Sequence, residues 1–375
     1  MRTARRSFLP IGAVAAYDAL GYALVAPILP ALRERAHASP LAASLIFAAV
    51  SIGMFAGFVI GGLVIIRSGP RNAAIGGVLL HLSGDLLFIV GHTAGVYEAA
   101  RVAQGLGSGM VWMSSVFAVI VRWPEHPEAQ LGKILTGFAA GSVVGPLVAA
   151  LGGPVRPFVA DACLAVVGLT AAMFYPTAGG GSFGWRLHVL RSRRLAFALV
   201  MITLVALVIS VLDGSYTLHF ATKLSQTGLA VLITSSTIAY GVGALLPIAS
   251  RSLRASRASA QVGAVCCAAL LLGLTVFDGV AAWFVLIVLL GAALGVTEAG
   301  VLSISSSAAE GGLMTAQVVY AQAFAFGFLI GPPVATWLTT QFSLISSGVV
   351  VGLVLLLGAG SGFLAPMPDQ PGPMR

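Results

Sequence analysis

Long apolar segments, repeated along the whole chain, constrain this sequence more than any other feature. Short polar stretches separate twelve such segments, each roughly 20 residues long, which is the length of helix that crosses a hydrocarbon core about 30 Å thick. An α-helix also satisfies its own backbone hydrogen bonds inside a membrane. The sequence therefore predicts an all-α polytopic membrane protein with 12 transmembrane helices. The segments are 8–32, 43–66, 73–91, 96–121, 134–151, 155–174, 195–220, 227–249, 260–277, 280–306, 313–338 and 343–364.

Composition excludes the other broad classes of protein. Hydrophobic residues make up 58% of the 375 residues and charged residues only 9%, whereas soluble domains carry about 25% charged residues. Disordered chains need the opposite balance, and membrane β-barrels show shorter, alternating segments. The net charge of +8 comes from loop arginines, so we expect no nucleic-acid partner. The three cysteines lie in apolar segments and the loop histidines lack ligand spacing, so no metal site and no cofactor are predicted.

Basic residues predict the orientation, because they favour the cytoplasmic side of a membrane. Fifteen of them fall on one side of the predicted spans and four on the other. We therefore expect a multi-pass protein of the plasma (inner) membrane with both termini in the cytoplasm. The fifteen are Arg2, Arg5, Arg6, Arg67, Arg71, Arg122, Lys133, Arg186, Arg191, Arg193, Arg194, Arg251, Arg254, Arg257 and Arg375, and the four are Arg33, Arg35, Arg156 and Lys223.

One long polar interruption divides the chain into equal halves. Residues 176–194 have a glycine-rich start and a basic end, with six predicted spans on each side. The fifth and eleventh spans share a Gly-x-x-x-Gly-Pro pattern, at 141–146 and 327–332, and Asp18 in the first span is loosely echoed by Asp213 in the seventh. We predict two six-helix bundles, 1–175 and 195–375, related by pseudo-two-fold symmetry and joined by a cytoplasmic linker, an arrangement typical of transporters that alternate access.

The first span contains the strongest functional signal. Asp18 lies ten residues after Phe8, about 15 Å into the helix and near the middle of a bilayer. A carboxylate at that depth costs several kcal/mol and is a functional candidate by default. It could exchange a proton, pair with a cationic substrate, or bind a neighbouring helix structurally. Pro27 and Pro30 should bend the outer part of this helix, either to line a pathway or to fit its neighbours.

The fourth span places an arginine in an apolar helix. Arg101 is followed by Gln104 and by glycines at 105, 107 and 109. An intramembrane arginine needs a carboxylate or a wet cavity, and glycines let another backbone approach closely. Glu98, three residues earlier on the same face, offers a simple local ion pair as the alternative.

The fifth span presents a row of small residues. Gly132, Gly141 and Gly145 precede Pro146, which suggests a flat face for tight helix contact and a fixed kink. The corresponding pair in the eleventh span is Gly331 and Pro332.

Further polar residues lie within the spans. His81 and Asp85 are four residues apart on one helical face, and they could form a proton relay or a mutually satisfied structural pair. Glu298 and Asp213 lie inside the tenth and seventh spans, and each could face a central cavity or pack structurally. Asp161 is expected to anchor the outer end of the sixth span.

Together these features resemble the major facilitator superfamily, and within it the twelve-span drug:proton antiporters related to the vesicular amine transporters. The resemblance covers nearly the whole chain by architecture, and three motifs contribute to it. They are Asp followed by Pro-x-x-Pro at Asp18, Pro27 and Pro30; R-x-x-Q-G-x-G at Arg101, Gln104, Gly105 and Gly107; and the antiporter motif at Gly132, Gly141, Gly145 and Pro146, whose last two glycines are Ala149 and Ala150 here.

The loop between the second and third spans departs from the family pattern. The family has G-x3-D-R-x-G-R-K or close to it, and this chain keeps Gly62, Arg67, Gly69 and Arg71. Ile66 stands where the family has its aspartate, so the charge relay that this loop is thought to supply lacks its acid.

The resemblance implies a role for each motif. It implies that Asp18 carries substrate or proton, that Arg101 takes part in proton transfer, and that the helix with Gly145 and Pro146 favours exchange. We predict a transporter rather than an enzyme: a monomeric, proton-coupled exporter of small amphipathic or cationic organic compounds, with that substrate, protons and the lipid bilayer as its partners. The alternatives are a metabolite importer or uniporter of the same fold, and a transport-deficient membrane sensor or scaffold, which Ile66 suggests.

Overall fold

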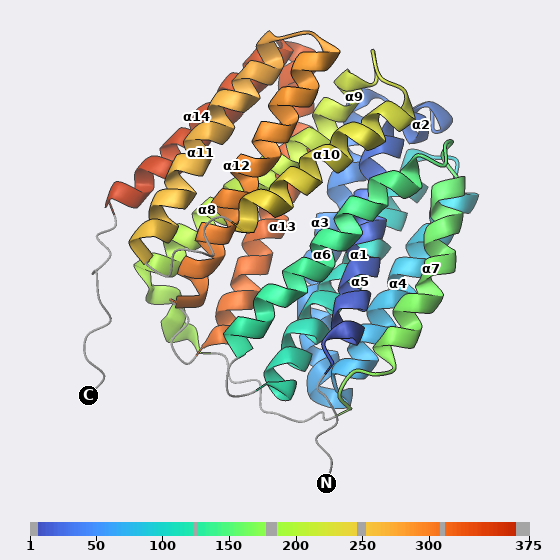
Figure 1. Ribbon diagram of the computed structural model, residues 1–375. Coiled ribbons are helices and arrows are strands. Elements are labelled where there is room, and N and C mark those ends of the chain that lie inside the picture. Colours follow the sequence, from blue (N-terminus) through green and yellow to red (C-terminus); the bar gives the residue numbers. More distant parts are fainter. Residues whose placement is uncertain (1–6, 124–126, 178–185, 246–252, 308–311, 365–375) are drawn as a thin grey trace. The chain divides into compact units, whose positions relative to one another are not determined.

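A computed structural model describes residues 7–123, 127–177, 186–245, 253–307 and 312–364, and all regular secondary structure in these ranges is helical. The first half contains α1 (Leu9–Ala23), α2 (Val25–Arg35), α3 (Pro40–Ser68), α4 (Pro70–Val90), α5 (Ala94–Arg122), α6 (Pro127–Ala149) and α7 (Arg156–Ala172). The second half contains the 3-10 helix η1 (Leu187–Arg191), α8 (Arg193–Val211), the π-helix η2 (Leu212–Tyr216), α9 (Thr217–Phe220), α10 (Gln226–Leu245), α11 (Leu253–Val276), α12 (Val280–Ser307), α13 (Leu313–Gln341) and α14 (Leu344–Leu364) (Figure 1).

Each of the twelve apolar segments coincides with a helix or a run of adjoining helices. Within the described ranges, nine are long and apolar enough to cross a membrane, with α8, η2 and α9 counted as one, and the bent pair α1 and α2 makes a tenth. The two remaining segments coincide with α6 and with α7, which has 17 residues. The all-α polytopic class is confirmed, and the count of twelve is consistent with the structure.

The first span bends where its prolines remove backbone donors. Helices α1 and α2 meet at Leu24 at an angle of 40°. Pro27 has no N–H to donate to the carbonyl of Ala23, so the helix loses a hydrogen bond at that turn. Pro30 lies inside α2 without ending it. The bend therefore falls one turn before the first proline.

The described helices form two compact units. One contains residues 1–184 and 212–234, and the other contains 185–211 and 235–375. Residues 212–234 belong to the first unit because η2 contacts α2 and α3, and α9 contacts α2. The domain boundaries expected from the sequence remain a prediction, and residues 178–185 of the expected linker lie outside the described ranges.

Glycines of α5 bring three helices of the first unit into close contact. Residues two apart on a helix point to nearly opposite sides, since a turn takes 3.6 residues. Gly105 and Gly109 face α3, and Gly107 faces α4 at Gly77. A β-carbon on any of them would collide with backbone atoms of the neighbouring helix. The glycines that follow Arg101 therefore set the spacing of α3, α4 and α5.

The same kind of contact occurs in both units. In the first, α6 packs on α1, where a β-carbon on Gly141 would collide with the carbonyl of Ala16. In the second, α13 packs on α8, where a β-carbon on Gly327 would collide with the carbonyl of Thr203. The two repeated glycine patterns thus make equivalent helix contacts.

The rest of the glycine pattern supports this packing. A β-carbon on Gly145 would lie 2.5 Å from the carbonyl of Leu20, and one on Gly331 would collide with Ser210. Gly132 is helical, but its surroundings lie outside the described side chains. Pro146 stands one turn before the end of α6, whereas α13 continues past Pro332 to Gln341.

Gly141→Ala should destabilise the protein by about 1 to 3 kcal/mol, because the added methyl group must separate α6 from α1. The control is Gly241→Ala in α10, where a β-carbon meets nothing within 4 Å. The melting temperatures of both variants are measured by heating the protein in detergent and quantifying the folded fraction by size-exclusion chromatography. An equal melting temperature for the two variants would contradict the packing role of Gly141.

Candidate functional site

A buried group of charged side chains gathers inside the first unit. Asp18 on α1 is only 4% exposed. Its Oδ1 accepts a hydrogen bond from the Ser108 hydroxyl of α5 at 2.6 Å and lies 3.3 Å from Nδ1 of His81 on α4. The carboxylate of the first span is therefore held by two other helices.

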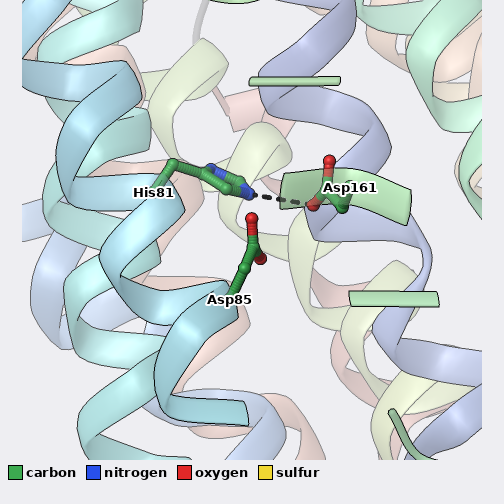
Figure 2. A group of neighbouring side chains, drawn as sticks. All are labelled: His81, Asp85 and Asp161. Carbon is green, nitrogen blue, oxygen red and sulfur yellow. Dashed lines mark ion pairs between the residues drawn. The ribbon is translucent and has the colours of Figure 1, made fainter. Parts of the chain in front are cut away.

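His81 lies between two carboxylates. Its Nδ1 faces Asp18, and its Nε2 lies 3.6 Å from Oδ2 of Asp161 on α7. Figure 2 shows the side chains of Asp161 and Asp85 converging on the imidazole ring. All four residues are buried. Three acidic side chains from α1, α4 and α7 thus surround one histidine.

A chain of hydrogen bonds leads from this group to Arg101 on α5. The amide Nε2 of Gln104 donates to Oδ1 of Asp85 at 2.8 Å, and Nη1 of Arg101 donates to Oε1 of Gln104 at 2.8 Å. The guanidinium lies 5.4 Å from the ring centre of Tyr22 and 5.5 Å from that of Phe47, distances at which cation–π attraction operates. Arg101 is thereby fixed between α1 and α3.

The expected local ion pair does not form. Arg101 is fully buried, and in the described part of the chain no carboxylate lies within ion-pair distance of it. Glu98 is half-buried on the same helix. Arg101 bonds to Gln104 instead, so two residues of its own motif pair with each other.

The group contains more negative than positive charge. With all groups ionised, Asp18, Asp85 and Asp161 carry three negative charges against two positive charges on Arg101 and protonated His81. Both oxygens of Asp161 and Oδ2 of Asp85 are buried without a hydrogen-bond partner. Unpaired buried charge is costly, so the site favours uptake of a positive species.

Three of these residues could also contact a metal ion. His81, Asp85 and Asp161 each offer one ligand atom, and these atoms lie within 4.8 Å of one another. Nitrogen and carboxylate donors suit metals such as zinc. The prediction of no metal site rests on the cysteines and the loop histidines and does not consider these three residues, two of which lie in one span and the third 76 positions further along the chain.

A glycine leaves the space that the charged group occupies. A β-carbon on Gly21 of α1 would collide with Nε2 of His81 and with Oδ2 of Asp161. The ion pair therefore fills the volume in which any other residue at position 21 would place its side chain. Gly84 of α4 similarly admits Gln104, whose Cγ would lie 2.5 Å from an added β-carbon.

Two further candidate acids make no hydrogen bond or ion pair with Asp18 in the described part of the chain. Asp213 is half-buried in η2, which belongs to the first unit and contacts α2 and α3. Glu298 lies in α12 of the second unit, where it accepts a hydrogen bond from the Tyr240 hydroxyl.

The loop motif between α3 and α4 is structured by one glycine and one arginine. Gly69 ends α3 and precedes α4 with φ of +87°, a conformation that glycine adopts without strain. Arg71 donates from Nε to the carbonyl of Tyr175 at 3.2 Å. Arg67 and Ile66 are exposed, and Gly62 lies in α3 beside Met113. The loop is therefore joined to the segment that follows α7 even without an acid at position 66.

Sequence reasoning placed Asp161 incorrectly. It was expected to anchor the end of the sixth span, yet it is fully buried against His81. Asp161 follows the first residue of α7 by five positions, or about 7.5 Å, a depth that already suggested burial. Ser108 gave no signal of its own, because a serine is common in membrane helices.

Gly21→Ala should lower the free energy of unfolding by about 1 to 3 kcal/mol, because its methyl group displaces His81 and Asp161. Gly12→Ala on the same helix meets only the movable ring of Phe8 and is the control. In a double-mutant cycle, Gly21→Ala combined with His81→Ala should cost less than the sum of the two single changes. Additive costs would show that Gly21 does not serve the charged group.

Comparison with known proteins agrees with this architecture. The structure is similar to the crystal structure of a D-xylose-proton symporter, with a TM-score of 0.77 and 16% identity, covering 95% of this chain and 96% of that one. It is also similar to the human organic anion transporter MFSD10 (TETRAN), with a TM-score of 0.75 and 14% identity, covering 96% of this chain and 100% of that one. No curated protein sequence matches significantly. Residues 11–315 match the Major Facilitator Superfamily, and the chain belongs to that family.

Proposed function

We propose that this chain is a proton-coupled secondary transporter that exports small amphipathic or cationic organic compounds by alternating access. Membership of the Major Facilitator Superfamily supports secondary transport. The observation that carries the finer proposal is Asp18, a buried carboxylate in α1 of the first span, within a group whose acids outnumber its cations. The name of one similar protein, a D-xylose-proton symporter, includes the same coupling ion.

Asp18 would couple the two fluxes by competition. A carboxylate neutralised by a proton cannot also be neutralised by a bound cation, so occupation by one favours release of the other. The Ser108 hydroxyl donates to Oδ1 and holds the carboxyl group in one orientation. A neutral Asp18 is also less costly in a membrane interior, which would favour the structural change that returns an unloaded transporter.

Arg101 would stabilise the ionised acids. Its guanidinium is held by Tyr22 and Phe47 and reaches Asp85 through Gln104. When Asp85 releases a proton, the hydrogen bond from the Gln104 amide stabilises the negative charge left on its carboxylate. Arg101 polarises that amide and so strengthens the hydrogen bond. We therefore assign Arg101 to proton transfer rather than to a local structural pair.

The remaining motif residues would serve the conformational change. We propose that α6 and α1 move together during alternating access, because they are in close contact at Gly141 and Gly145. Since α1 carries Asp18, this movement would expose the carboxylate to one side of the membrane and then to the other. We also propose that Asp85, Asp213 and Glu298 take part in substrate or proton coupling. Each is an acid that is buried or half-buried within a membrane span. We further propose a monomer in the plasma (inner) membrane with both termini in the cytoplasm, and a cytoplasmic linker at 176–194 between two six-helix domains. The conformational residues are Gly62, Arg67, Gly69, Arg71, Gln104, Gly105, Gly132, Gly141, Gly145, Pro146, Gly331 and Pro332.

Asp18→Asn should reduce proton-driven export by about tenfold or more, because an amide neither takes up nor releases a proton. The measurement is accumulation of ethidium, a fluorescent cation, in everted membrane vesicles energised with a proton gradient. Ser114→Ala is the control, because Ser114 is equally buried on α5 but bonds to a carbonyl of its own helix. Wild-type export that persists after an uncoupler collapses the gradient would contradict the proposal.

Further transport measurements distinguish the other transport modes. Uptake of a compound into whole cells with no expulsion would indicate an importer or uniporter. Ile66 favours a third possibility, a sensor or scaffold with an impaired transport cycle, because an exposed apolar side chain occupies the place of an expected acid. Ile66→Asp should increase export several-fold if the loop limits transport. If neither the wild type nor Ile66→Asp transports any compound in a broad panel, the proposal of transport fails.

A further inference from the structure

We propose that His81 links Asp18 to a second proton-binding carboxylate, Asp161, so that one proton can move between α1 and α7. The inference rests on the proposed proton coupling and assigns Asp161 and His81 to it. Its basis is a geometric arrangement that neither motif nor family membership assigns: one buried imidazole with a carboxylate at each ring nitrogen. Figure 2 shows the Asp161 end of this arrangement.

The two ring nitrogens of His81 are buried without a hydrogen-bond partner, and each of them faces a carboxylate. A neutral imidazole has one N–H donor and one nitrogen that accepts. Here Nδ1 faces Asp18 at 3.3 Å and Nε2 faces Asp161 at 3.6 Å, and ionised carboxylates only accept. With a neutral imidazole, the lone pair of one ring nitrogen would therefore point at the lone pairs of an ionised carboxylate. One additional proton on Asp18, His81 or Asp161 removes this repulsion.

Transfer along the group conserves atoms and charge. In the first step, the O–H bond of protonated Asp18 breaks and an N–H bond forms at Nδ1, giving an imidazolium between two carboxylates. In the second step, the N–H bond at Nε2 breaks and an O–H bond forms on Asp161. One proton has left Asp18 and one has arrived at Asp161, while His81 has exchanged one neutral tautomer for the other. The net charge of the three groups is −1 throughout, because a single added proton offsets one of the two carboxylates.

Asp161 is free to receive this proton. Both of its oxygens are fully buried and lack a hydrogen-bond partner. An acid with only a structural purpose would be expected to have these bonds satisfied. The unpartnered carboxylate is aimed at His81, which is itself 1% exposed. Asp161, the second proton-binding site, is thus a buried carboxylate whose hydrogen bonding becomes satisfied when a proton binds to it.

Other titratable and polar side chains lie close to the three groups that would transfer the proton. From α1, the Tyr17 ring lies 5.2 Å from the imidazole, ring centre to ring centre. From α4 comes Asp85, and from α5 come Arg101, Gln104 and Ser108, which bond to Asp85 or Asp18. The only charged residue of α3 is Arg67, in its exposed last turn. Among the described residues of these helices, Arg101 is the only buried arginine or lysine.

The test compares proton-driven export with exchange in reconstituted vesicles. Ethidium is the probe, and each variant is measured for export driven by a pH gradient and for ethidium self-exchange without one. Asp161→Asn and His81→Gln should lower the ratio of driven export to self-exchange by about tenfold, because the proton loses its second site. Asp161→Glu should restore part of the ratio. Cys163→Ser, an exposed change two residues along α7, is the matched control.

A second measurement does not depend on transport. Nitrogen-15 spectra of histidine-labelled protein report the protonation of each ring nitrogen, and His81→Gln identifies the His81 signal among the six histidines. Asp161→Asn should change that signal at constant pH, whereas Cys163→Ser should leave it unchanged.

The outcomes separate this inference from the proposed function. If wild-type export ignores the pH gradient, the proposed function fails, and the spectra alone decide the role of Asp161. If wild-type export is proton-driven and Asp161→Asn retains both its ratio and the wild-type His81 signal, only the link through His81 is overturned. Export that requires added Zn²⁺ or Mn²⁺ and is lost in a chelator would also overturn it, because the three residues would then bind a metal.

Discussion

The structure of the first unit depends on the cost of placing charge where water is absent. Three carboxylates and an arginine lie buried between helices, and each of them alone would cost several kcal/mol in a membrane interior. They are tolerated together because hydrogen bonds and ion pairs connect α1, α4, α5 and α7. Removing one of these residues would leave its partners buried and unpaired. That change destabilises a protein more than replacing both partners with apolar residues does.

Close backbone contact makes those interactions possible. Side chains as short as aspartate and serine can meet only where helix axes are near, and glycines of α3, α4, α5 and α6 provide that spacing. The second unit shows the same relationship between α13 and α8, although its polar contact, between Tyr240 and Glu298, is simpler. Packing is thus shared by both units, whereas the concentration of charge is described in only one of them.

The sequence predicted more of the fold than of the site. Apolar length alone located a helix or a run of adjoining helices at each of the twelve segments, because the hydrocarbon core imposes one dimension on each helix. Asp18, Asp85, Arg101 and Gln104 could be chosen because polar groups are rare in such segments. Their partners could not be chosen, because spacing along one helix does not reveal which neighbouring helix faces it. Asp161 shows this limit: its depth of five residues in α7 is compatible with burial but does not identify a partner, and only the packing of α7 on α1 and α4 places it at His81.

Gly21 has a consequence for how this site can change over evolutionary time. The volume that a β-carbon would need there is filled by His81 and Asp161, which come from two other helices. A lineage can therefore acquire a side chain at position 21 only after it has lost or moved one of those two residues. The three positions should covary as a unit, and a glycine at position 21 marks relatives that are still able to hold the pair.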